Sequence, residues 1–323
     1  MIASKEFDRG HRIAQSEDNW RLVRRTQFTI TFMEDRQPTI RSRELGEGLR
    51  RAMEHAGLHA SEMARQLDWS ASRVSRLLSG KRGGSSNDIA VFLAICGVRG
   101  AERKRLMALA LDQHRKGWVQ HHGARLPKQL RTLINHEDKA TKISEFEFNV
   151  VPGLLQTGEY ARALITEAGT VPQDEIDELV GARLGRRKLF SRPKPLLFTF
   201  YIHEFALRLP VGGPAVMSEQ LHELLRWSVR PSISLRVVPA AIGAHAGING
   251  SFRLMEFKEI KPIVYLESET SSLFLEVPIE IDAYRAILTK LGAVALSEGQ
   301  SREFISNLAM ELYSDREAHD QLA

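Results

Sequence analysis

Two arginines, three residues apart, could recognise another molecule by hydrogen bonding. Arg73 and Arg76 lie in the stretch Ser70–Leu78, where serines fill most of the other polar positions. A guanidinium group can donate two parallel hydrogen bonds to guanine, which discriminates against a wrong base by about 1–3 kcal/mol. A serine hydroxyl can bond to a base edge or to a phosphate. These residue types favour nucleic-acid recognition, provided that one rigid element presents them together.

The residues before this stretch have the spacing of two short helices joined by a tight turn. Ala64 is small and stands where the two backbones would approach each other most closely. Asp68, four positions further on, tolerates the left-handed backbone that such a turn requires, where glycine is usual. Val74 is the apolar residue that the second helix must bury, and Ser70 can cap that helix through its hydroxyl. The spacing predicts a helix-turn-helix.

Once Val74 and Leu77 face inwards, helical geometry points the polar residues of the second helix outwards. In a helix-turn-helix this outer surface enters the major groove of DNA. Lys81 and Arg82 follow the helix and suit contacts with phosphates. The predicted DNA-contacting residues are Ser70, Ala71, Ser72, Arg73, Ser75, Arg76, Ser79, Lys81 and Arg82. The alternative is an amphipathic helical hairpin with a solvated basic face.

The charge of the chain is unevenly distributed. Residues 1–120 hold 22 lysines and arginines against 14 acidic residues, whereas residues 121–323 hold 23 against 26. A basic first part with a net charge of +8 and a second part with −3 place any contact with a polyanion in the first part. A chance asymmetry of a solvated surface is the other interpretation of charge alone.

Cysteine content and apolar runs predict a cytoplasmic, nucleoid-associated protein. Cys96 is the single cysteine, so no disulfide can form within the chain, and its apolar neighbours predict a buried thiol in a reducing cytosol. The longest apolar stretch, Ile89–Val98, is half of the roughly 20 residues that a membrane span needs. The first residues lack the apolar core of a secretory signal. No membrane partner is predicted.

Composition and periodicity divide the chain into four regions: an N-terminal extension at 1–40, a helical domain at 41–112, a linker at 113–127 and a regulatory domain at 128–323. The extension is polar and irregular, which predicts disorder. A short strand at Gln27–Phe32 that pairs with another chain is the alternative, because apolar and polar residues alternate there.

The last region alternates apolar strands with amphipathic helices. The predicted strands are Lys142–Val150, Leu196–Ile202, Ile233–Val238, Phe252–Phe257, Ile263–Glu267 and Ser272–Leu275. The predicted helices are Thr157–Ala168, Asp174–Phe190, Ala215–Ser228, Pro278–Leu291 and Ser297–Tyr313, the last beginning with a capping box from Ser297 to Gln300. We therefore expect an all-α helix-turn-helix N-terminal domain followed by an α+β C-terminal domain with a mixed sheet flanked by helices.

Several separated motifs occur in the order found in one known family. They are Arg43-Glu44-Leu45, Ala56-Gly57-Leu58, Leu78-Ser79-Gly80-Lys81, the stretch Val151–Leu164, Pro210-Val211-Gly212-Gly213-Pro214 and Gly243-Ala244-His245-Ala246-Gly247. With them the chain resembles the XRE (Cro/CI-type) helix-turn-helix regulators, and within these an actinobacterial antitoxin-like, WhiJ-like subgroup. The resemblance covers residues 41–313 and implies a transcriptional regulator with a C-terminal regulatory module, often encoded beside a small partner protein.

Some positions depart from this family. Ala71 stands where relatives often begin the recognition helix with glutamine, so base contacts are expected to depend more on Arg73 and Arg76. A carboxylate pair before the first strand of the second domain is reduced to Glu137, with Lys139 at the other place.

No enzymatic motif is evident in the sequence. Its histidines show no metal-ligand spacing, and no phosphate-binding loop or nucleophile elbow occurs, so we predict no catalytic residue, no metal and no cofactor. A polar, ligand-sized pocket in the second domain is more plausible. Its predicted residues are Arg183, Arg186, Glu204, His245, Tyr265 and Glu267. Structural salt bridges and surface residues are the alternative interpretation of this set.

Two functions are compatible with these observations. In the first, a homodimer binds a partly palindromic operator in double-stranded DNA and is controlled by a small-molecule effector or a protein at the second domain. In the second, an antitoxin-like protein sequesters a small partner protein from a neighbouring gene, and its DNA binding regulates its own operon.

Overall fold

The computed structural model describes residues 38–81, 84–121, 127–194, 196–268 and 270–320. The predicted strand at Gln27–Phe32 lies outside these residues. Among the helices in the described part of the chain, none combines the length and apolar character needed to cross a membrane.

The described part of the N-terminal domain is entirely helical, as predicted. Its helices are α1 (Ile40–His55), α2 (Ala60–Gln66), α3 (Ala71–Leu78), α4 (Ser86–Ile95) and α5 (Gly100–Leu111). Side-chain oxygens of Thr39, Ser70 and Ser85 cap α1, α3 and α4, and Ser85 forms a full capping box with Asp88. One apolar core joins all five helices, and its fully buried members include Leu49, Met63, Val74, Ile89, Phe92 and Leu106.

The turn between α2 and α3 has the predicted geometry. Asp68 has a φ of 52°, and among the described residues no other non-glycine residue has a positive φ. Ala64 is 5% exposed, and its carbonyl oxygen accepts a hydrogen bond of 2.8 Å from the backbone N–H of Trp69. Val74 is fully buried in the shared core. The predicted roles of Ala64, Asp68 and Val74 in packing are therefore confirmed.

A close backbone contact between α1 and α3 escaped the sequence analysis. A Cβ atom at Gly46 would lie 2.5 Å from the carbonyl oxygen of Leu78, so only glycine allows α1 to approach the end of α3 this closely. The guanidinium of Arg50 donates a hydrogen bond of 3.2 Å to the same carbonyl. Both contacts hold the C-terminal end of α3 against α1.

The C-terminal domain is built on a mixed sheet, as predicted. The strands are β1 (Trp118–His121), β2 (Lys142–Glu147), β3 (Leu197–His203), β4 (Ile233–Val238), β5 (Phe252–Glu256), β6 (Ile263–Glu267) and β7 (Ser271–Leu275). In the described residues they form a seven-stranded sheet in the order β1-β7-β6-β5-β2-β3-β4. The pairs β2·β3 and β3·β4 are parallel, and the other pairs are antiparallel.

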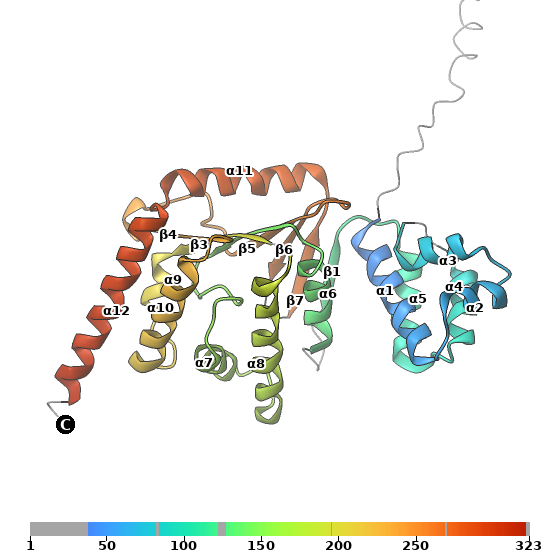
Figure 1. Cartoon of the computed structure of the whole chain (residues 1–323), viewed down its shortest axis with the longest axis horizontal. Helices are drawn as coiled ribbons and strands as arrows, with labels where there is room; N and C mark the ends of the chain where they lie inside the picture. Colours follow the sequence, from blue (N-terminus) through green and yellow to red (C-terminus); the bar gives the residue numbers. More distant parts are fainter. Residues whose placement is uncertain (1–37, 82–83, 122–126, 195, 269, 321–323) are drawn as a thin grey trace, which may run out of the picture. The chain divides into compact units, whose positions relative to one another are not determined.

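Helices cover both faces of this sheet (Figure 1). They are α6 (Pro127–Glu137), α7 (Gly158–Ala168), α8 (Ile176–Gly185), α9 (Glu204–Arg208), α10 (Pro214–Ser228), α11 (Pro278–Val294) and α12 (Glu298–Asp320). Figure 1 shows α11 along one face and α6, α7, α8 and α10 on the opposite face. The apolar residues separate in the same way, because Phe146, Tyr201 and Val264 pack with α11, while Ile143, Phe200 and Ile263 pack in the larger core on the other side.

The predicted linker at 113–127 is wrong in part, because β1 lies within it and pairs antiparallel with β7. A strand of four residues has too short a pattern to be recognised, and its existence depends on a partner strand whose paired residues stand 150 to 156 positions later in the chain. Helices α6 and α9 also escaped the sequence analysis. The predicted helix at Asp174–Phe190 is α8 flanked by two short 3-10 segments.

Two smaller predictions have different outcomes. Cys96 is half-buried rather than buried, although burial still raises the pKa of its thiol to about 11, which keeps it protonated. The capping box at α12 is confirmed, since Ser297 N–H bonds to Gln300 Oε1 at 3.0 Å and Gln300 N–H bonds to Ser297 Oγ at 3.3 Å.

The turn at Asp68 yields a stability prediction. Replacing Asp68 with glycine removes the steric cost of left-handed backbone, so the Asp68→Gly variant should unfold with a free energy up to about 1 kcal/mol higher than the parent chain. Replacing it with β-branched valine should lower that free energy by about 1–2 kcal/mol. Urea unfolding followed by circular dichroism measures both. Equal stabilities of the two variants would show that the backbone of this turn is not strained.

Candidate nucleic-acid interface

Helix α3 presents a polar face to solvent. Only Val74, Leu77 and Leu78 are buried in this helix. The predicted DNA-contacting residues that the structure describes are all exposed, and they are Ser70, Ala71, Ser72, Arg73, Ser75, Arg76, Ser79 and Lys81. Arg82 lies outside the described residues. The predicted face therefore exists as one continuous surface on a helix whose opposite side is fixed in the core.

The first turn of α3 combines a cap with free donors. Ser70 Oγ accepts a hydrogen bond of 3.2 Å from the backbone N–H of Arg73, as predicted for a capping serine. The hydroxyl of Ser72 lies 3.2 Å from the same oxygen. The remaining N–H groups of the first turn point along the helix axis, and together with the helix dipole they favour a phosphate group.

Arg73 is held in place by two neighbours. Its guanidinium carbon lies 3.7 Å from the centre of the Trp69 ring, a stacked cation–π contact. Its Nη2 lies 3.1 Å from Oδ2 of Asp88, which also accepts the backbone N–H of Ser85 at 2.9 Å. The Arg73 side chain is still 45% exposed. Its direction is thus preset, and part of its charge is balanced by Asp88.

Sequence reasoning did not assign Trp69 and Asp88 to this interface. A signal for each was present, because an aromatic residue directly follows the turn residue Asp68 and an acidic residue stands three positions after Ser85. What could not be read is that α4 brings its first turn beside α3, which is a result of tertiary packing.

Arg76 is less restrained than Arg73. It lies one turn further along α3 and is exposed, and it makes no ion pair within the described part of the chain. Lys81, just beyond the helix, is likewise exposed. A freely extending guanidinium on the outer face can reach a base edge, whereas an ammonium group at the end of the helix suits the phosphate backbone.

Four of the six residues predicted to form a ligand pocket lie at one end of the sheet, on the side of α6 and α8. Arg186 is 4% exposed, and Tyr265 bonds through its hydroxyl to Ser272 at 3.0 Å. Arg183 is partly buried and donates a hydrogen bond of 2.7 Å to Gln156 Oε1. Glu267 is exposed and acts electrostatically on Arg183.

Beneath these residues lies a network of buried ion pairs. Glu137, which is fully buried, bonds to Arg186 Nε at 2.9 Å and to Arg186 Nη2 at 2.6 Å. It also contacts Arg253, whose Nη2 donates a hydrogen bond of 2.6 Å to Glu145. Burial alone would raise the pKa of Glu137, but the two guanidinium groups lower it. Arg186 and Glu137 therefore have a structural role in the core, whatever binds above them.

A second acidic residue in this region, Glu147, differs from Glu137 because its pKa is raised rather than lowered. Burial, together with the neighbouring carboxylate of Glu145, raises the pKa of Glu147 well above its ordinary value. The neutral form of the Glu147 carboxyl group is therefore favoured.

The other two predicted pocket residues, Glu204 and His245, lie in a different cluster. Glu204 bonds to Arg208 at 2.6 Å and accepts the N–H of Ala240 at 2.9 Å. The ring of His245 stacks with that of His203 at 5.2 Å between centres, and Phe148 stacks on His203 at 4.6 Å. The six residues belong to two clusters held by separate contacts, and their convergence on one site stays a prediction.

Both histidines of this stack favour the neutral form. Burial is the main cause that lowers the pKa of His203 and of His245. The Nδ1 atom of His203 accepts the N–H of Phe205 and that of His245 accepts the N–H of Gly247, each at 3.1 Å. In the part of the chain that the structure describes, no group of three or more histidine, cysteine, aspartate or glutamate side chains could hold a metal ion.

Comparisons with known proteins assign both domains. A family model described as a helix-turn-helix domain matches residues 44–106, and one described as a domain of unknown function, DUF5753, matches residues 130–307. A search of curated proteins gave no match. Among solved structures, TrmBL2, an archaeal chromatin protein reported to show a novel mode of DNA binding, is similar at a TM-score of 0.28 and 10% identity, over 74% of this chain and 88% of that chain. A TM-score this low carries no argument about fold or function.

The buried network yields a stability prediction. Replacing Glu137 with glutamine keeps the shape but leaves Arg186 and Arg253 buried without their shared counter-charge, which should lower the free energy of unfolding by about 3–5 kcal/mol. Urea unfolding of the full chain measures this. The matched control, Glu303→Gln on the exposed side of α12, should change stability by less than about 0.5 kcal/mol. If both variants were equally stable, the network would contribute nothing to folding.

Proposed function

The chain belongs to the DUF5753 family, and from the helix-turn-helix domain in front of that domain we propose that it is a sequence-specific, DNA-binding transcriptional regulator. In this proposal α3 enters the major groove of double-stranded DNA. Arg76 reads a base edge, Arg73 is oriented by Trp69 and Asp88, and Lys81 binds a phosphate.

One observation carries this proposal. Helix α3 is fixed on one side by Val74, Leu77 and Leu78, while every described residue of its predicted DNA-contacting face is exposed. An amphipathic hairpin without a binding role would also bury one side of its second helix. It would not need the tight turn at Asp68 or an arginine, Arg73, that is held in one direction by stacking on Trp69.

The further parts of the proposal depend on the resemblance to XRE, WhiJ-like regulators. We propose that two copies bind a partly palindromic operator, in the nucleoid of the cytoplasm, and that the C-terminal domain is a non-catalytic regulatory module controlled by a small-molecule effector or a small protein. The antitoxin-like alternative differs in one respect, namely that a stable complex with the small protein encoded by a neighbouring gene would form in the absence of DNA.

Selection from a random duplex pool tests the central proposal. The full chain should enrich a short motif, and anisotropy titrations on that motif should give an affinity at least about a thousandfold above that for unrelated duplex. The affinity should fall steeply with salt because condensed counterions are released. No enrichment, or equal affinity for all duplexes, would contradict the proposal.

Substitutions of Arg76 and of Lys81 should change DNA binding in different ways. The Arg76→Ala variant should lose about 1–3 kcal/mol of discrimination at one base position, because it removes a base contact. The Lys81→Ala variant should weaken binding to all duplexes alike and reduce the salt slope by about one. Titrations of both variants against the selected motif and its single-base variants separate these effects. Identical behaviour would show that the recognition face is assigned wrongly.

Asp88 should oppose DNA binding. The Asp88→Asn variant removes a negative charge beside the phosphate backbone and releases Arg73, and asparagine retains an oxygen for the Ser85 N–H. We expect affinity for DNA at low salt to rise about two- to fivefold, the range of one exposed ion pair. Asp112→Asn, at the half-exposed C-cap of α5 where the carboxylate likewise pairs with arginines, Arg41 and Arg115, is the matched control and should leave the affinity for DNA unchanged. A lower affinity of the Asp88 variant would mean that the orientation of Arg73 by Asp88 contributes more to binding than the repulsion between Asp88 and the phosphates removes.

A further inference from the structure

One stretch of the C-terminal domain carries lysines and arginines without an acidic residue. It runs from residue 179 to residue 203, and its cations are Arg183, Arg186, Arg187, Lys188, Arg192 and Lys194. Residues 121–323 together hold 23 lysines and arginines against 26 acidic residues, so 17 against 26 remain outside this stretch. A block of positive charge on an otherwise acidic domain favours contact with a polyanion. It escaped the sequence analysis because the sum over the whole domain hides it.

Four of these six side chains reach the surface of the domain. The first two are held by the contacts beneath α8 described above. The Lys188 side chain is 66% exposed, and Lys194 is exposed as well. Arg187 and Arg192 are less accessible, with side chains that are 25% and 26% exposed. The two lysines are therefore the cations of this stretch that a large partner can reach most easily.

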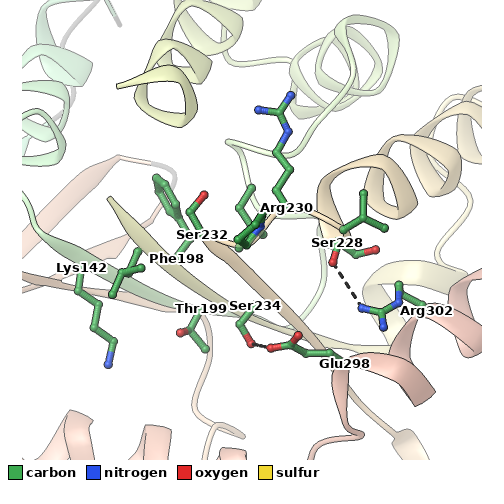
Figure 2. A pocket seen from close by; sticks show the side chains of 13 residues that line it. Lys142, Phe198, Thr199, Ser228, Arg230, Ser232, Ser234, Glu298 and Arg302 are labelled. Atoms are coloured by element: carbon green, nitrogen blue, oxygen red, sulfur yellow. Dashed lines mark hydrogen bonds between the residues drawn. The ribbon is translucent and has the colours of Figure 1, made fainter. Parts of the chain in front are cut away.

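The end of α10 adds two further cations beside this stretch. The 3-10 segment Arg186–Ser191 packs on α10, since the rings of Phe190 and Trp227 lie 4.5 Å apart between their centres. The Arg226 side chain is 62% exposed. Arg230 is exposed and stacks on the Trp227 ring at 4.4 Å, and Figure 2 shows its side chain extending away from the strands. Stacking on a ring leaves the N–H groups at the edge of the guanidinium available.

Ion pairs join the two groups of cations into one surface. Glu223 of α10 pairs with Arg187 at 3.1 Å and with Arg226 at 2.5 Å. Asp138, just after α6, pairs with Lys188 at 3.9 Å. Because Arg187 and Lys188 are neighbours in the chain, these contacts connect the end of α6, the 3-10 segment and the end of α10.

The basic surface carries more positive charge than its carboxylates balance. Its cations are Arg187, Lys188, Arg192, Lys194, Arg226 and Arg230, and Asp138 and Glu223 are the carboxylates that pair with four of them. These eight residues have a net charge of +4. Like charges gathered at this density repel one another, so an anionic partner that lies across them is attracted and relieves the repulsion.

The arrangement favours duplex DNA over an acidic protein. The cations come from separate segments and spread over an outer surface, which suits an extended row of phosphates, and DNA carries one negative charge for about every 1.7 Å of its axis. Arginine forks match the oxygens of a phosphate. Interfaces between proteins have an apolar core, whereas Leu189, in the 3-10 segment at the centre of this surface, is only 2% exposed.

We propose that the basic surface binds the phosphate backbone of duplex DNA without regard to sequence. Lys188, Lys194 and Arg230 contact the phosphates. Arg187 and Arg192 also donate to backbone carbonyls of the chain, and they fix the surface from beneath. The inference rests on the proposed DNA binding and adds a second contact to it. Helix α3 decides the preference among sequences, while the basic surface raises the affinity for every sequence, so either part can fail without the other.

A double variant, Lys188→Gln with Lys194→Gln, tests the proposal in the full chain. Anisotropy titrations with an unrelated duplex, in salt from about 50 to 200 mM, should show an affinity at least about tenfold lower than that of the parent chain. The salt slope should fall by about two, because each lost phosphate contact contributes about 0.9. An unchanged affinity and slope would overturn the proposal.

A matched control separates the site from the net charge. Lys258→Gln with Lys290→Gln removes the same charge from two exposed lysines of the same domain, and Lys290 lies on α11, on the opposite face of the sheet from α10 (Figure 1). This control should bind the unrelated duplex like the parent chain. If both double variants lost affinity equally, only the total charge would matter and the basic surface would not be a binding site.

Two further measurements identify the partner. The ratio of the affinities for a selected motif and for the unrelated duplex should stay the same in the Lys188 and Lys194 double variant. A missing preference for any motif in the parent chain would contradict the role of α3 alone, since the basic surface is tested by the absolute affinity. If the double variant kept its affinity for DNA but lost binding of poly-L-glutamate, the surface would serve an acidic protein and the proposal would be wrong.

Discussion

The exposed polar face of α3 depends on one backbone constraint, the left-handed turn at Asp68. This turn lets α2 and α3 pack through Ala64 and Val74, so that one side of α3 is fixed and the other is left to solvent. The close approach of Gly46 to Leu78 fixes the far end of the same helix. A helix of only eight residues is too short to be stable alone, so these tertiary contacts determine the orientation of α3.

The two arginines of α3 have different environments. Arg73 is stacked on Trp69 and bonded to Asp88, whereas Arg76 extends into solvent. A preset side chain loses less conformational entropy on binding, while a free one can adapt to the base that it meets. Helix α3 thus presents an oriented guanidinium group and an adaptable one on successive turns.

The C-terminal domain buries several charged side chains on one face of its sheet. Glu137 balances Arg186 and Arg253, and Glu145 completes the pairing. Since an unpaired buried charge costs several kcal/mol, the network limits how α6 and α8 can pack on the strands. It also holds the Arg186 side chain in the core, where it is 4% exposed.

The sequence by itself determined the helix-turn-helix, because Ala64, Asp68, Val74 and the cap at Ser70 are local signals with fixed spacing. It also determined the strands Ile233–Val238 and Ile263–Glu267, whose apolar runs are long enough to be recognised, and the helix cap at Ser297. Only the tertiary structure decided that β1 joins β7, that Asp88 reaches Arg73, and that the predicted pocket residues separate into two clusters. The physical reason is that each of these depends on contacts between segments far apart in the chain, for which neither periodicity nor residue type specifies the partner.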